Sequence, residues 1–396
     1  MIRYDVIIVG AGPAGATAAR YLSAAGIRVL LIEKYPVPRS KPCAGGLPFH
    51  VDSFMDSEML LELSKNVVSR VCDRTVFTFR FKRAVELRSP DAEYRMVMRD
   101  VFDAFLVRRA VQAGCELLDG LEVKGVSEDR DQVRVTTSKG DFLASYVIGA
   151  DGPFSIVARS SGLIPDRIFG WAVNAEVKVS DADLDRQAST VSIDFGSVPA
   201  GYAWIFPKAD HLSCGIGTGL AKLPEMKRVM MNCLDGFKST RGREGVELRG
   251  YPLCSGSMLS LKVNSNRILL AGDAACLTDP LTGEGIYYAM ASGEIASRHL
   301  VRIISEDTDS MKCLDGYSSE LDTVIRDELF HAGKFYGLLR DYPRIVFELG
   351  VANPFVSGRF HQIFTGRIKY RDLYQELRGR FGSVFRRFRA LYPGGK

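Results

Sequence analysis

The chain has 396 residues, of which 46% are hydrophobic and 25% are charged, and its formal net charge is +5. This size and composition indicate a globular protein with a substantial core, and so small a positive charge does not suggest nucleic-acid binding. The eight cysteines include no Cys-x-x-Cys pair, and the five histidines show no metal-ligand spacing. We therefore expect no disulfide framework and no metal site, and a reducing, cytoplasmic compartment. No run of 18 apolar residues predicts a membrane-spanning helix.

The first predicted elements are a strand over residues 4–9, a glycine-rich turn, a helix over residues 16–25 and a strand over residues 29–32. Glu33 follows the second strand, where its carboxylate can accept a hydrogen bond from a ribose hydroxyl. This order of elements is that of a dinucleotide-binding unit. Its place near the N-terminus favours FAD among the dinucleotides.

The turn itself supplies the phosphate site. Gly10 allows a tight turn, Gly12 lets the backbone approach a pyrophosphate, and Gly15 lets the helix pack closely on the strand. With Pro13 and Ala14, they place a helix N-terminus and its partial positive charge at the phosphates. The alternative is a glycine-rich turn that precedes a helix and binds nothing.

The rest of the chain alternates between predicted strands and helices around a β-rich block. We predict paired strands over 71–87, a helix over 102–113, strands over 116–126, 133–137 and 142–148, a mainly β block over 169–261, a strand over 267–271, and helices over 285–305 and beyond 317. This order predicts an α/β fold with interleaved domains. A Rossmann-type FAD-binding domain (1–70, 96–168 and 262–316) would alternate with a β-rich substrate domain (71–95 and 169–261), followed by a helical C-terminal region (317–396).

Two further motifs follow predicted strands. They are Ala-Asp-Gly at residues 150–152 and Gly-Asp-Ala at residues 272–274, which continues into Asp-Pro-Leu-Thr-Gly-Glu-Gly-Ile at residues 279–286. Together with the N-terminal turn, they resemble the flavoprotein monooxygenase-like fold, whose members bind FAD.

This resemblance implies that Asp273 contacts the ribityl chain and that Gly283, Gly285 and Ile286 lie at the pyrimidine edge of the flavin. A helix N-terminus at that edge would stabilise the negative charge of a reduced flavin. Taken alone, Asp273 also suits a helix N-cap, and Asp151 suits a turn that caps the next helix.

A narrower resemblance rests on Lys-Pro-Cys-Ala-Gly-Gly at residues 41–46, Tyr-x-Trp-x-Phe-Pro at residues 202–207 and Gly-Ile-Gly at residues 215–217. These segments are similar to the flavin loop and the isoprenoid-pocket signature of geranylgeranyl reductases, and the likeness covers roughly residues 1–300. It implies FAD-dependent reduction of C=C bonds in a geranylgeranyl or other isoprenoid chain of a lipid or chlorophyll-type precursor.

The same resemblance assigns residues to the two ligands. It adds to the FAD site Lys34, Cys43, Ala44, Gly46, Arg99 and Val123. It assigns to the isoprenoid pocket Tyr202, Trp204, Phe206, Gly215 and Gly217.

The residue types permit two interpretations at several of these positions. Tyr202, Trp204 and Phe206 alternate, so they share one face of a strand and form either a hydrocarbon-binding wall or ordinary core packing. Cys43 is either the catalytic acid that protonates a substrate carbon or a small buried side chain. Arg99 lies either beside FAD or in solvent.

The C-terminal segment 367–392 contains seven Arg and one Lys. Its apolar residues recur at helical spacing: Leu373, Leu377, Phe381, Val384, Phe388 and Leu391. Such a helix either lies on an anionic membrane surface or docks on the protein with its arginines in water.

Two other functions share these features. One is an FAD-dependent monooxygenase or halogenase, although the Trp-x-Trp-x-Ile-Pro run of halogenases is absent. The other is a flavoprotein that binds isoprenoids without net redox chemistry. Since the chain has no second dinucleotide fingerprint, we expect an external electron donor, either NAD(P)H or a ferredoxin-type protein.

Overall fold

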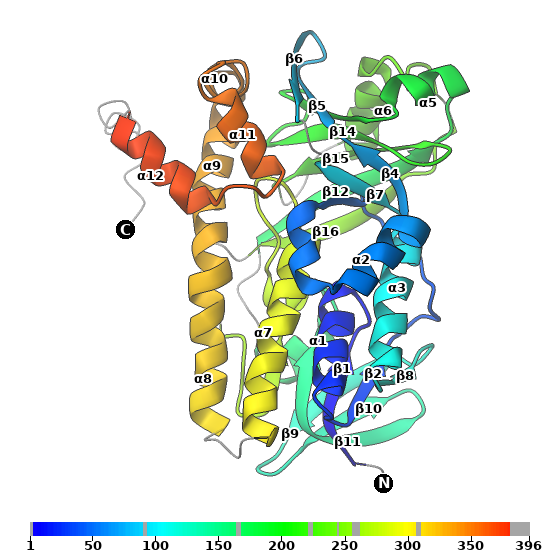
Figure 1. Cartoon of the computed structure of the whole chain (residues 1–396), viewed down its shortest axis with the longest axis vertical. Coiled ribbons are helices and arrows are strands. Elements are labelled where there is room, and N and C mark those ends of the chain that lie inside the picture. Colours follow the sequence, from blue (N-terminus) through cyan, green and yellow to red (C-terminus); the bar gives the residue numbers. More distant parts are fainter. Residues whose placement is uncertain are drawn as a thin grey trace.

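A seven-stranded sheet with helices packed on it forms the lower part of the molecule (Figure 1). The computed structural model describes residues 3–89, 93–163, 168–220, 225–243, 245–255, 262–305 and 310–380. The strand order in this lower sheet is β8 (Glu116–Leu118), β2 (Val29–Ile32), β1 (Arg3–Val9), β11 (Gly140–Gly149), β10 (Val133–Thr137) and β9 (Val123–Glu128), with β17 (Ile268–Leu270) paired to β11.

Strands β8, β2, β1, β11 and β17 pair in parallel, whereas β10 pairs antiparallel with both β11 and β9. All four residues of β2 are buried, as expected of a parallel strand covered on both faces. Because the pairing is parallel, β1, β11 and β17 all end at the same edge of the sheet.

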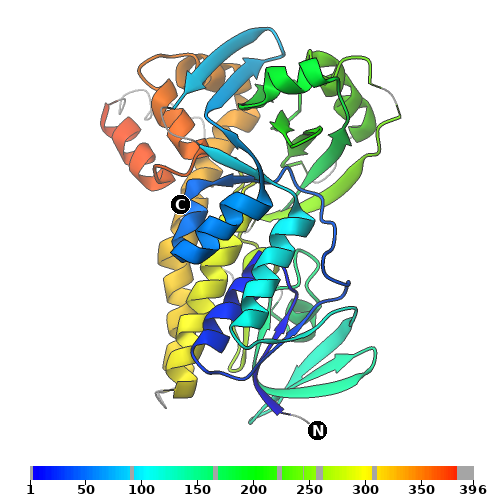
Figure 2. The same ribbon diagram turned by 45° about the vertical axis from the view of Figure 1, so that its right-hand side comes forward.

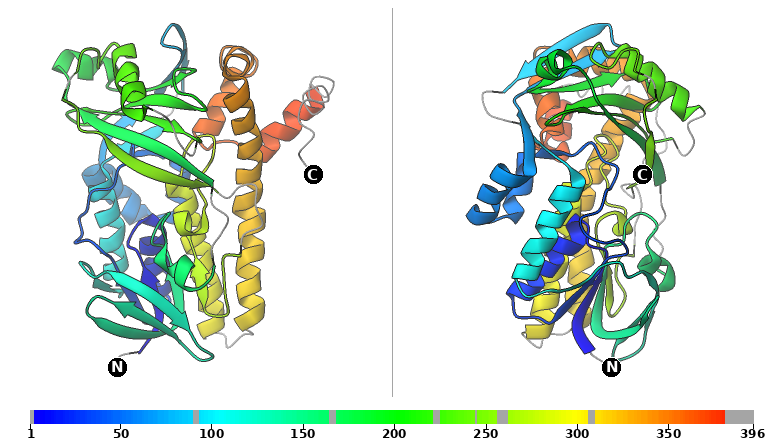
Figure 3. Two further views of the ribbon diagram at one scale, coloured as in Figure 1. Left: turned by 180° about the vertical axis from the view of Figure 1, so that it is seen from behind. Right: turned by 90° about the vertical axis from the view of Figure 1, so that its right-hand side faces the viewer.

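Four helices pack side by side in a layer beside the lower sheet (Figure 3). They are α1 (Pro13–Ala24), α3 (Arg99–Gln112), α7 (Ile286–Ser305) and α8 (Ser310–Leu321). A Cβ added at Gly293 of α7 would lie 2.3 Å from the Ala14 carbonyl oxygen, so the absence of a side chain lets α7 approach the start of α1.

A second seven-stranded sheet, the upper sheet, caps the first (Figure 2). Its order is β16 (Arg249–Ser255), β12 (Ile168–Val177), β15 (Leu212–Thr218), β14 (Gly201–Pro207), β13 (Thr190–Phe195), β5 (Arg74–Phe79) and β6 (Arg83–Arg88). The pairs are antiparallel except for β13 and β5, which are parallel.

The two faces of the upper sheet have different partners. The outer-face residues, among them Ala203 and Ile205 of β14, share an apolar cluster with α5 (Asp181–Gln187) and α6 (Met226–Gly236). The opposite face carries the aromatic residues of β14 and faces the lower sheet and the C-terminal helices.

The C-terminal helices cover part of this inner face. They are α9 (Asp327–Asp341), α10 (Pro343–Val346), α11 (Ser357–Phe364) and α12 (Tyr370–Arg380). Phe360 and Phe364 of α11 pack on Phe77 and Phe195 with ring centroids 5.5–6.2 Å apart. Aromatic side chains therefore attach the helical region to the upper sheet.

Smaller elements complete the fold. A three-stranded antiparallel sheet contains β3 (Gly46–Pro48), β7 (Tyr94–Val97) and β4 (Val68–Cys72), and the short helices are α2 (Ser57–Glu62) and α4 (Ile156–Ser160). No helix among the described residues is both long and apolar enough to cross a membrane.

The predicted α/β class is confirmed, with local differences. Helix α1 begins at Pro13 rather than at residue 16, since proline is well suited to the first turn of a helix. Helix α3 begins at Arg99 rather than at residue 102. The predicted paired strands over 71–87 divide between two sheets, and the 169–261 block contains α5 and α6, which we did not predict.

Candidate active site

A cavity of about 1460 Å³ lies between the edge where β1, β11 and β17 end, the inner face of the upper sheet and helix α9. The three motifs that follow these strands contribute Gly12, Ala150 and Asp273 to its lining. Parallel pairing therefore brings together segments that are more than a hundred residues apart in sequence, at the edge where α/β sheets bind ligands.

The N-terminal turn meets the cavity through backbone rather than side chains. Gly12 is the N-cap of α1 and lines the cavity with Pro13 and Ala14, so the first turn of the helix faces it. Gly10 has φ +100°, and a Cβ there would lie 2.4 Å from the Ala150 carbonyl oxygen. A Cβ at Gly15 would lie 1.9 Å from the Gly10 carbonyl oxygen, so this turn tolerates no side chain at either position.

Glu33 ends up buried beside the cavity rather than lining it. Its carboxylate accepts a hydrogen bond from the Ala11 N–H (2.9 Å) and pairs with Arg39 (3.2 Å). Arg39 also pairs with Asp103 at 3.0 Å. The carboxylate predicted for the ribose is therefore part of an ionic network behind the phosphate turn.

Arg99 belongs to the same network and lines the cavity, so it is not a solvated surface charge. Its guanidinium makes two hydrogen bonds to Asp103, at 2.8 and 2.9 Å. Burial alone would lower the pKa of Arg99, but Asp103 and then Cys43 outweigh it, so the pKa is raised. A permanent positive charge thus sits beside Cys43.

The Cys43 loop, residues 41–46, forms one wall of the cavity. Cys43 is half-buried, and its Sγ accepts a hydrogen bond from the Gly45 N–H at 3.4 Å. Gly45 has φ +63°, and a Cβ there would lie 2.1 Å from the Val97 carbonyl oxygen. A Cβ at Gly46 would lie 2.6 Å from the Phe206 ring, so the loop packs directly on the aromatic strand β14.

The residues of the 150–152 motif have two different roles. The Asp151 carboxylate accepts the N–H groups of Ile156 (2.7 Å) and Val157 (3.2 Å) at the start of α4. Asp151 therefore helps to cap α4, whose N-cap residue is Ser155, in line with the alternative that the sequence left open. Ala150 and Gly152 line the cavity.

Asp273 does not act as a helix N-cap, because it lies inside the short 3-10 turn Gly272–Ala275 that follows β17. One carboxylate oxygen accepts the Thr278 hydroxyl at 2.9 Å, and the other lies 3.8 Å from the Lys41 ammonium. Asp273 lines the cavity together with the Cys43 loop, to which Lys41 belongs.

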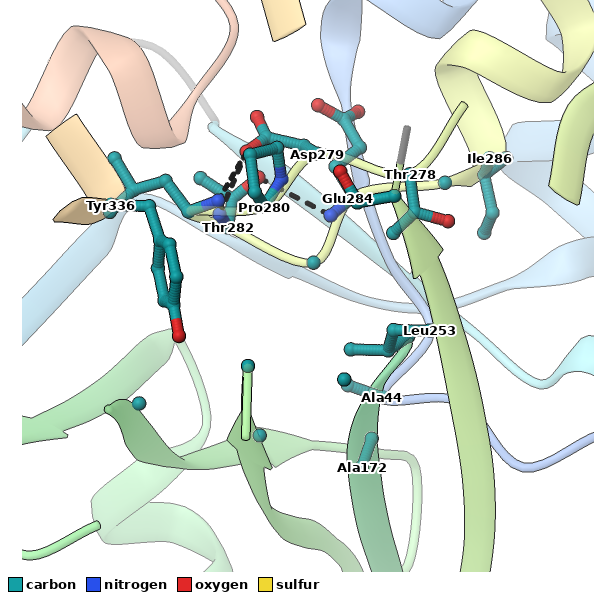
Figure 4. Close-up of a pocket in the computed structure, with 18 of the residues that line it drawn as sticks. Ala44, Ala172, Leu253, Thr278, Asp279, Pro280, Thr282, Glu284, Ile286 and Tyr336 are labelled. Atoms are coloured by element: carbon teal, nitrogen blue, oxygen red, sulfur yellow. Dashed lines mark hydrogen bonds between the residues drawn. The ribbon is translucent and has the colours of Figure 1, made fainter. Parts of the chain in front are cut away.

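The loop 279–285 closes this side of the cavity (Figure 4). Asp279 is buried and holds the loop by accepting the N–H groups of Leu281 (2.7 Å) and Thr282 (3.1 Å) and the Tyr370 hydroxyl (2.7 Å). Burial raises the pKa of Asp279 to about 6. Helix α7 then begins at Ile286, which lines the cavity with Gly283 and Gly285.

Strands β14 and β15 form the opposite wall. Tyr202, Trp204 and Phe206 all line the cavity, and Trp204 is also 6% exposed, so the wall and the core-packing interpretations both apply. On β15 their cross-strand partners include Gly217 and Gly215. A Cβ at Gly215 would lie 2.1 Å from the Trp204 indole, so the ring rests on bare backbone.

Much of the floor beside this wall lacks large side chains, although Asn174 of β12 also lines the cavity. Gly170 and Ala172 of β12, Gly217 of β15 and the adjacent Gly219 line the cavity. The alternation of small residues on β12 and β15 with aromatic residues on β14 produces an apolar groove in the sheet face. Such a groove suits a flexible hydrocarbon better than a rigid polar molecule.

The structure does not bring every predicted residue to the cavity. Gly10, Gly15 and Gly215 lie behind the lining as packing glycines. Lys34 is exposed and pairs with Glu122 at 2.8 Å, and Val123 is buried in the lower core. The roles of the residues that do line the cavity remain predictions.

Several lining residues were missed from the sequence. Lys41 lies over the Tyr251 ring at 4.6 Å, and both face the cavity. Tyr336 of α9 donates a hydrogen bond to the Ala200 carbonyl oxygen at 3.2 Å and lies at one end of the cavity in Figure 4. Lys41 lay within a motif we had singled out, but nothing in the local sequence placed α9 against the upper sheet.

Comparisons with known proteins support an FAD site here. A family model described as an FAD binding domain matches residues 3–194. Digeranylgeranylglycerophospholipid reductase 1 of Methanopyrus kandleri is 30% identical over an alignment covering 82% of this chain and 88% of its own. This chain belongs to the geranylgeranyl reductase family. It is accordingly an FAD-dependent oxidoreductase, and this family membership confirms the predicted FAD cofactor.

Solved structures show how widely the fold is shared. A geranylgeranyl bacteriochlorophyll reductase-like protein of Thermoplasma acidophilum matches with a TM-score of 0.70 and 23% identity, covering 88% of this chain and 98% of its own. The flavin-dependent brominase Bmp2 matches with a TM-score of 0.75 and 18% identity, covering 96% and 100%. These two structures establish the fold, while the family assignment rests on sequence.

Proposed function

We propose that this protein reduces C=C bonds in a geranylgeranyl-type isoprenoid chain, using electrons from bound FAD. The observation that carries the proposal is the groove of glycine and alanine bounded by Tyr202, Trp204 and Phe206, which continues directly from the flavin motifs. Relatives named digeranylgeranylglycerophospholipid reductase and geranylgeranyl diphosphate reductase support the same substrate class.

The residues present fit FAD. A Cβ at Gly10 or Gly15 would collide with backbone, which leaves a turn whose N–H groups face the cavity at the start of α1. Gly12 and Ala14 would hold the pyrophosphate, Asp273 the ribityl chain, and the start of α7 the pyrimidine edge. Bound and reduced, FAD would supply a hydride to one alkene carbon.

Cys43 is the side chain we assign to the proton. It lies in the loop between the flavin motifs and the aromatic wall, and its thiol is half-buried in the cavity lining. A general acid must reach the carbon that it protonates. We assign the proton to the thiol because it lies between the flavin motifs and the aromatic wall, where the reacting bond would be held.

The alternative functions have less support. Monooxygenases and halogenases share the fold, as the brominase shows, but the relatives with at least 30% identity include reductases by name. A non-redox isoprenoid carrier would need the groove but not a thiol beside the flavin motifs. The glycine-floored groove supports an isoprenoid ligand, and its continuity with the flavin motifs favours reduction of that ligand.

Two partners also belong to the proposal. We expect an external electron donor, either NAD(P)H or a ferredoxin-type protein, in the cytoplasm. The C-terminal segment 367–392 would make the contact with a membrane surface. Leu373 of α12 is buried against the protein, so the first part of that segment docks. The positions Phe381, Val384, Phe388 and Leu391 lie outside the described residues.

An anaerobic assay tests the proposal. FAD-loaded protein is reduced with dithionite, mixed with geranylgeranyl lipid without oxygen, and the lipid is analysed by mass spectrometry. We expect a gain of two hydrogens per reduced bond and stoichiometric flavin oxidation. A product formed only with oxygen would identify a monooxygenase, and unchanged lipid with reduced flavin would identify a carrier.

A further inference from the structure

Lys208 is a buried lysine directly after Pro207, the last residue of the aromatic strand β14. It is only 1% exposed. Its ammonium donates to the carbonyl oxygens of Ala44 (2.6 Å), Gly45 (3.3 Å) and Val97 (2.9 Å). No carboxylate pairs with Lys208 in the part of the chain that the structure describes. Its charge is therefore directed at the backbone of the Cys43 loop and of the adjacent strand β7.

Burying the Lys208 ammonium costs free energy unless each of its N–H groups donates a hydrogen bond. An ammonium carries three N–H groups, and three carbonyl oxygens surround it. A Cβ at Gly45 would lie 2.8 Å from the Lys208 Nζ, so the loop has no room to move toward the lysine. A neutral amine has two N–H groups, so one carbonyl would lose its donor.

We propose that Lys208 is a positioning residue that fixes the Cys43 loop to the aromatic strand. By holding the loop at Ala44 and Gly45, it keeps the Cys43 thiol at a set distance from Trp204 and Phe206. The effect on alkene reduction rests on the proposed function. The effect on the loop itself does not, and it can be measured without substrate.

The proposal predicts a pH dependence. The titratable groups that face Lys208 are Cys43, Cys72 of β4 and Glu176 of β12. Arg70 donates to the Lys208 carbonyl oxygen, and the Lys208 N–H donates to the His211 carbonyl oxygen. Burial lowers the pKa of Lys208 to about 8. The ammonium is present below that pH and is lost above it, so loop order should fall as the pH rises through about 8.

The test compares Lys208→Met with Lys139→Met, the same change at an exposed turn of the lower sheet. Hydrogen exchange of peptides covering residues 41–48 reports loop order. Alkylation of Cys43 by iodoacetamide, followed by mass spectrometry, reports the accessibility of the thiol, because the other cysteines that the structure describes are buried. We expect Lys208→Met, and not Lys139→Met, to lose exchange protection and to change the alkylation rate about tenfold.

Activity supplies the second readout. With pre-reduced FAD at saturation, we expect alkene reduction by Lys208→Met to be roughly a hundredfold slower, the effect of misplacing a reacting group by about 1 Å. Lys208→Arg keeps the charge at all accessible pH values. If Lys208 titration causes a decline in rate above pH 8, that decline disappears in Lys208→Arg, whereas a decline with any other cause persists.

The outcomes separate the two proposals. Loop exchange and Cys43 alkylation in Lys208→Met that match Lys139→Met would overturn the positioning role. If both change but the wild type reduces no alkene, the proposed function fails and the positioning role stands. Should Lys208→Met not fold, Lys208→Gln, which keeps a two-hydrogen donor, is measured in the same way and should give an intermediate loss of protection.

Discussion

The two walls of the cavity are built in opposite ways. At the edge of the lower sheet, the wall consists of backbone, and Gly10, Gly12 and Gly15 bring N–H groups and chain turns close together. On the upper sheet, the wall consists of side chains, and Tyr202 and Trp204 stand beside nearly bare strands.

This difference sets how each wall responds to change. A backbone wall depends on the absence of side-chain atoms, so a single added methyl group is enough to disrupt it. A side-chain wall binds through buried area, so its affinity changes in proportion to the area lost. We expect all-or-none effects at the first wall and graded effects at the second.

The largest effect is expected at Gly15. In Gly15→Ala the new Cβ would lie 1.9 Å from the Gly10 carbonyl oxygen, so the turn must move and FAD binding should be lost. Absorbance at 450 nm after reconstitution measures it. The matched control is Gly358→Ala in α11, where a Cβ meets nothing within 4 Å and should stabilise the helix by up to about 1 kcal/mol. Equal FAD content in Gly15→Ala and Gly358→Ala would contradict the all-or-none response expected of the backbone wall.

Cys43 lies where the two walls meet, and its removal should affect chemistry alone. We expect Cys43→Ala to slow alkene reduction by roughly 100-fold, the size of a lost general acid. FAD content and the rate of flavin reduction should not change. Single-turnover measurements with pre-reduced FAD isolate the step. A wild-type rate would assign the proton to water or to another residue.

Trp204 tests the graded response of the upper sheet. Truncation to Ala removes about 80 Å² or more of contact, worth about 2 kcal/mol or roughly thirtyfold in affinity for a long prenyl chain. The loss should shrink for short chains, and FAD should stay bound. Trp171 lies on β12, which β15 separates from β14. It follows Gly170 and precedes Ala172, which both face the cavity, so it points to the other face. Trp171→Ala should show no dependence on chain length.

The smallest effect concerns Asp279, whose loop joins the two walls. Its folded-state pKa of about 6 lies above the usual 3.8, so the folded protein binds the proton more tightly than the unfolded chain. The stability that this proton confers is complete below pH 3.8 and is lost as the pH rises to about 6. The free energy of unfolding of Asp279→Asn, relative to that of the wild type, should therefore rise by on the order of 2 kcal/mol over this interval. Urea titrations at pH 4 and pH 7 measure the stability difference between Asp279→Asn and the wild type. The same difference at both pH values would contradict the burial argument.

The sequence predicted the backbone wall better than the side-chain wall. The role of Gly15 is local, because the carbonyl that excludes a side chain there belongs to Gly10 of the same turn. The positive φ of Gly10 is also set within the turn, although the atoms that crowd it belong to Ala150. The shared face of Tyr202, Trp204 and Phe206 also followed from strand alternation. The covering of that face by α9 and α11 did not, since it depends on packing between segments more than a hundred residues apart.

Charged residues were the hardest to place. The ribose role of Glu33 stays a prediction, and its pairing with Arg39 was not foreseen because it depends on how the loop after β2 folds back. The burial of Lys208 could not be read from Pro-Lys-Ala-Asp-His, because a lysine in a turn is normally exposed. In both cases the decisive partner comes from a different element.

The upper sheet also has a consequence for how the chain is made. Strand β5 pairs in parallel with β13, and contacts between them, such as that of Thr78 with Asp194, join residues 116 positions apart. During synthesis, β5 and β6 leave the ribosome long before β13 and β14 exist, and their apolar face then has no partner. Such distant pairing slows folding and leaves unpaired strand edges exposed. We expect the nascent chain to depend on chaperones until β15 is complete, and a fragment ending near residue 160 to aggregate rather than to bind FAD on its own.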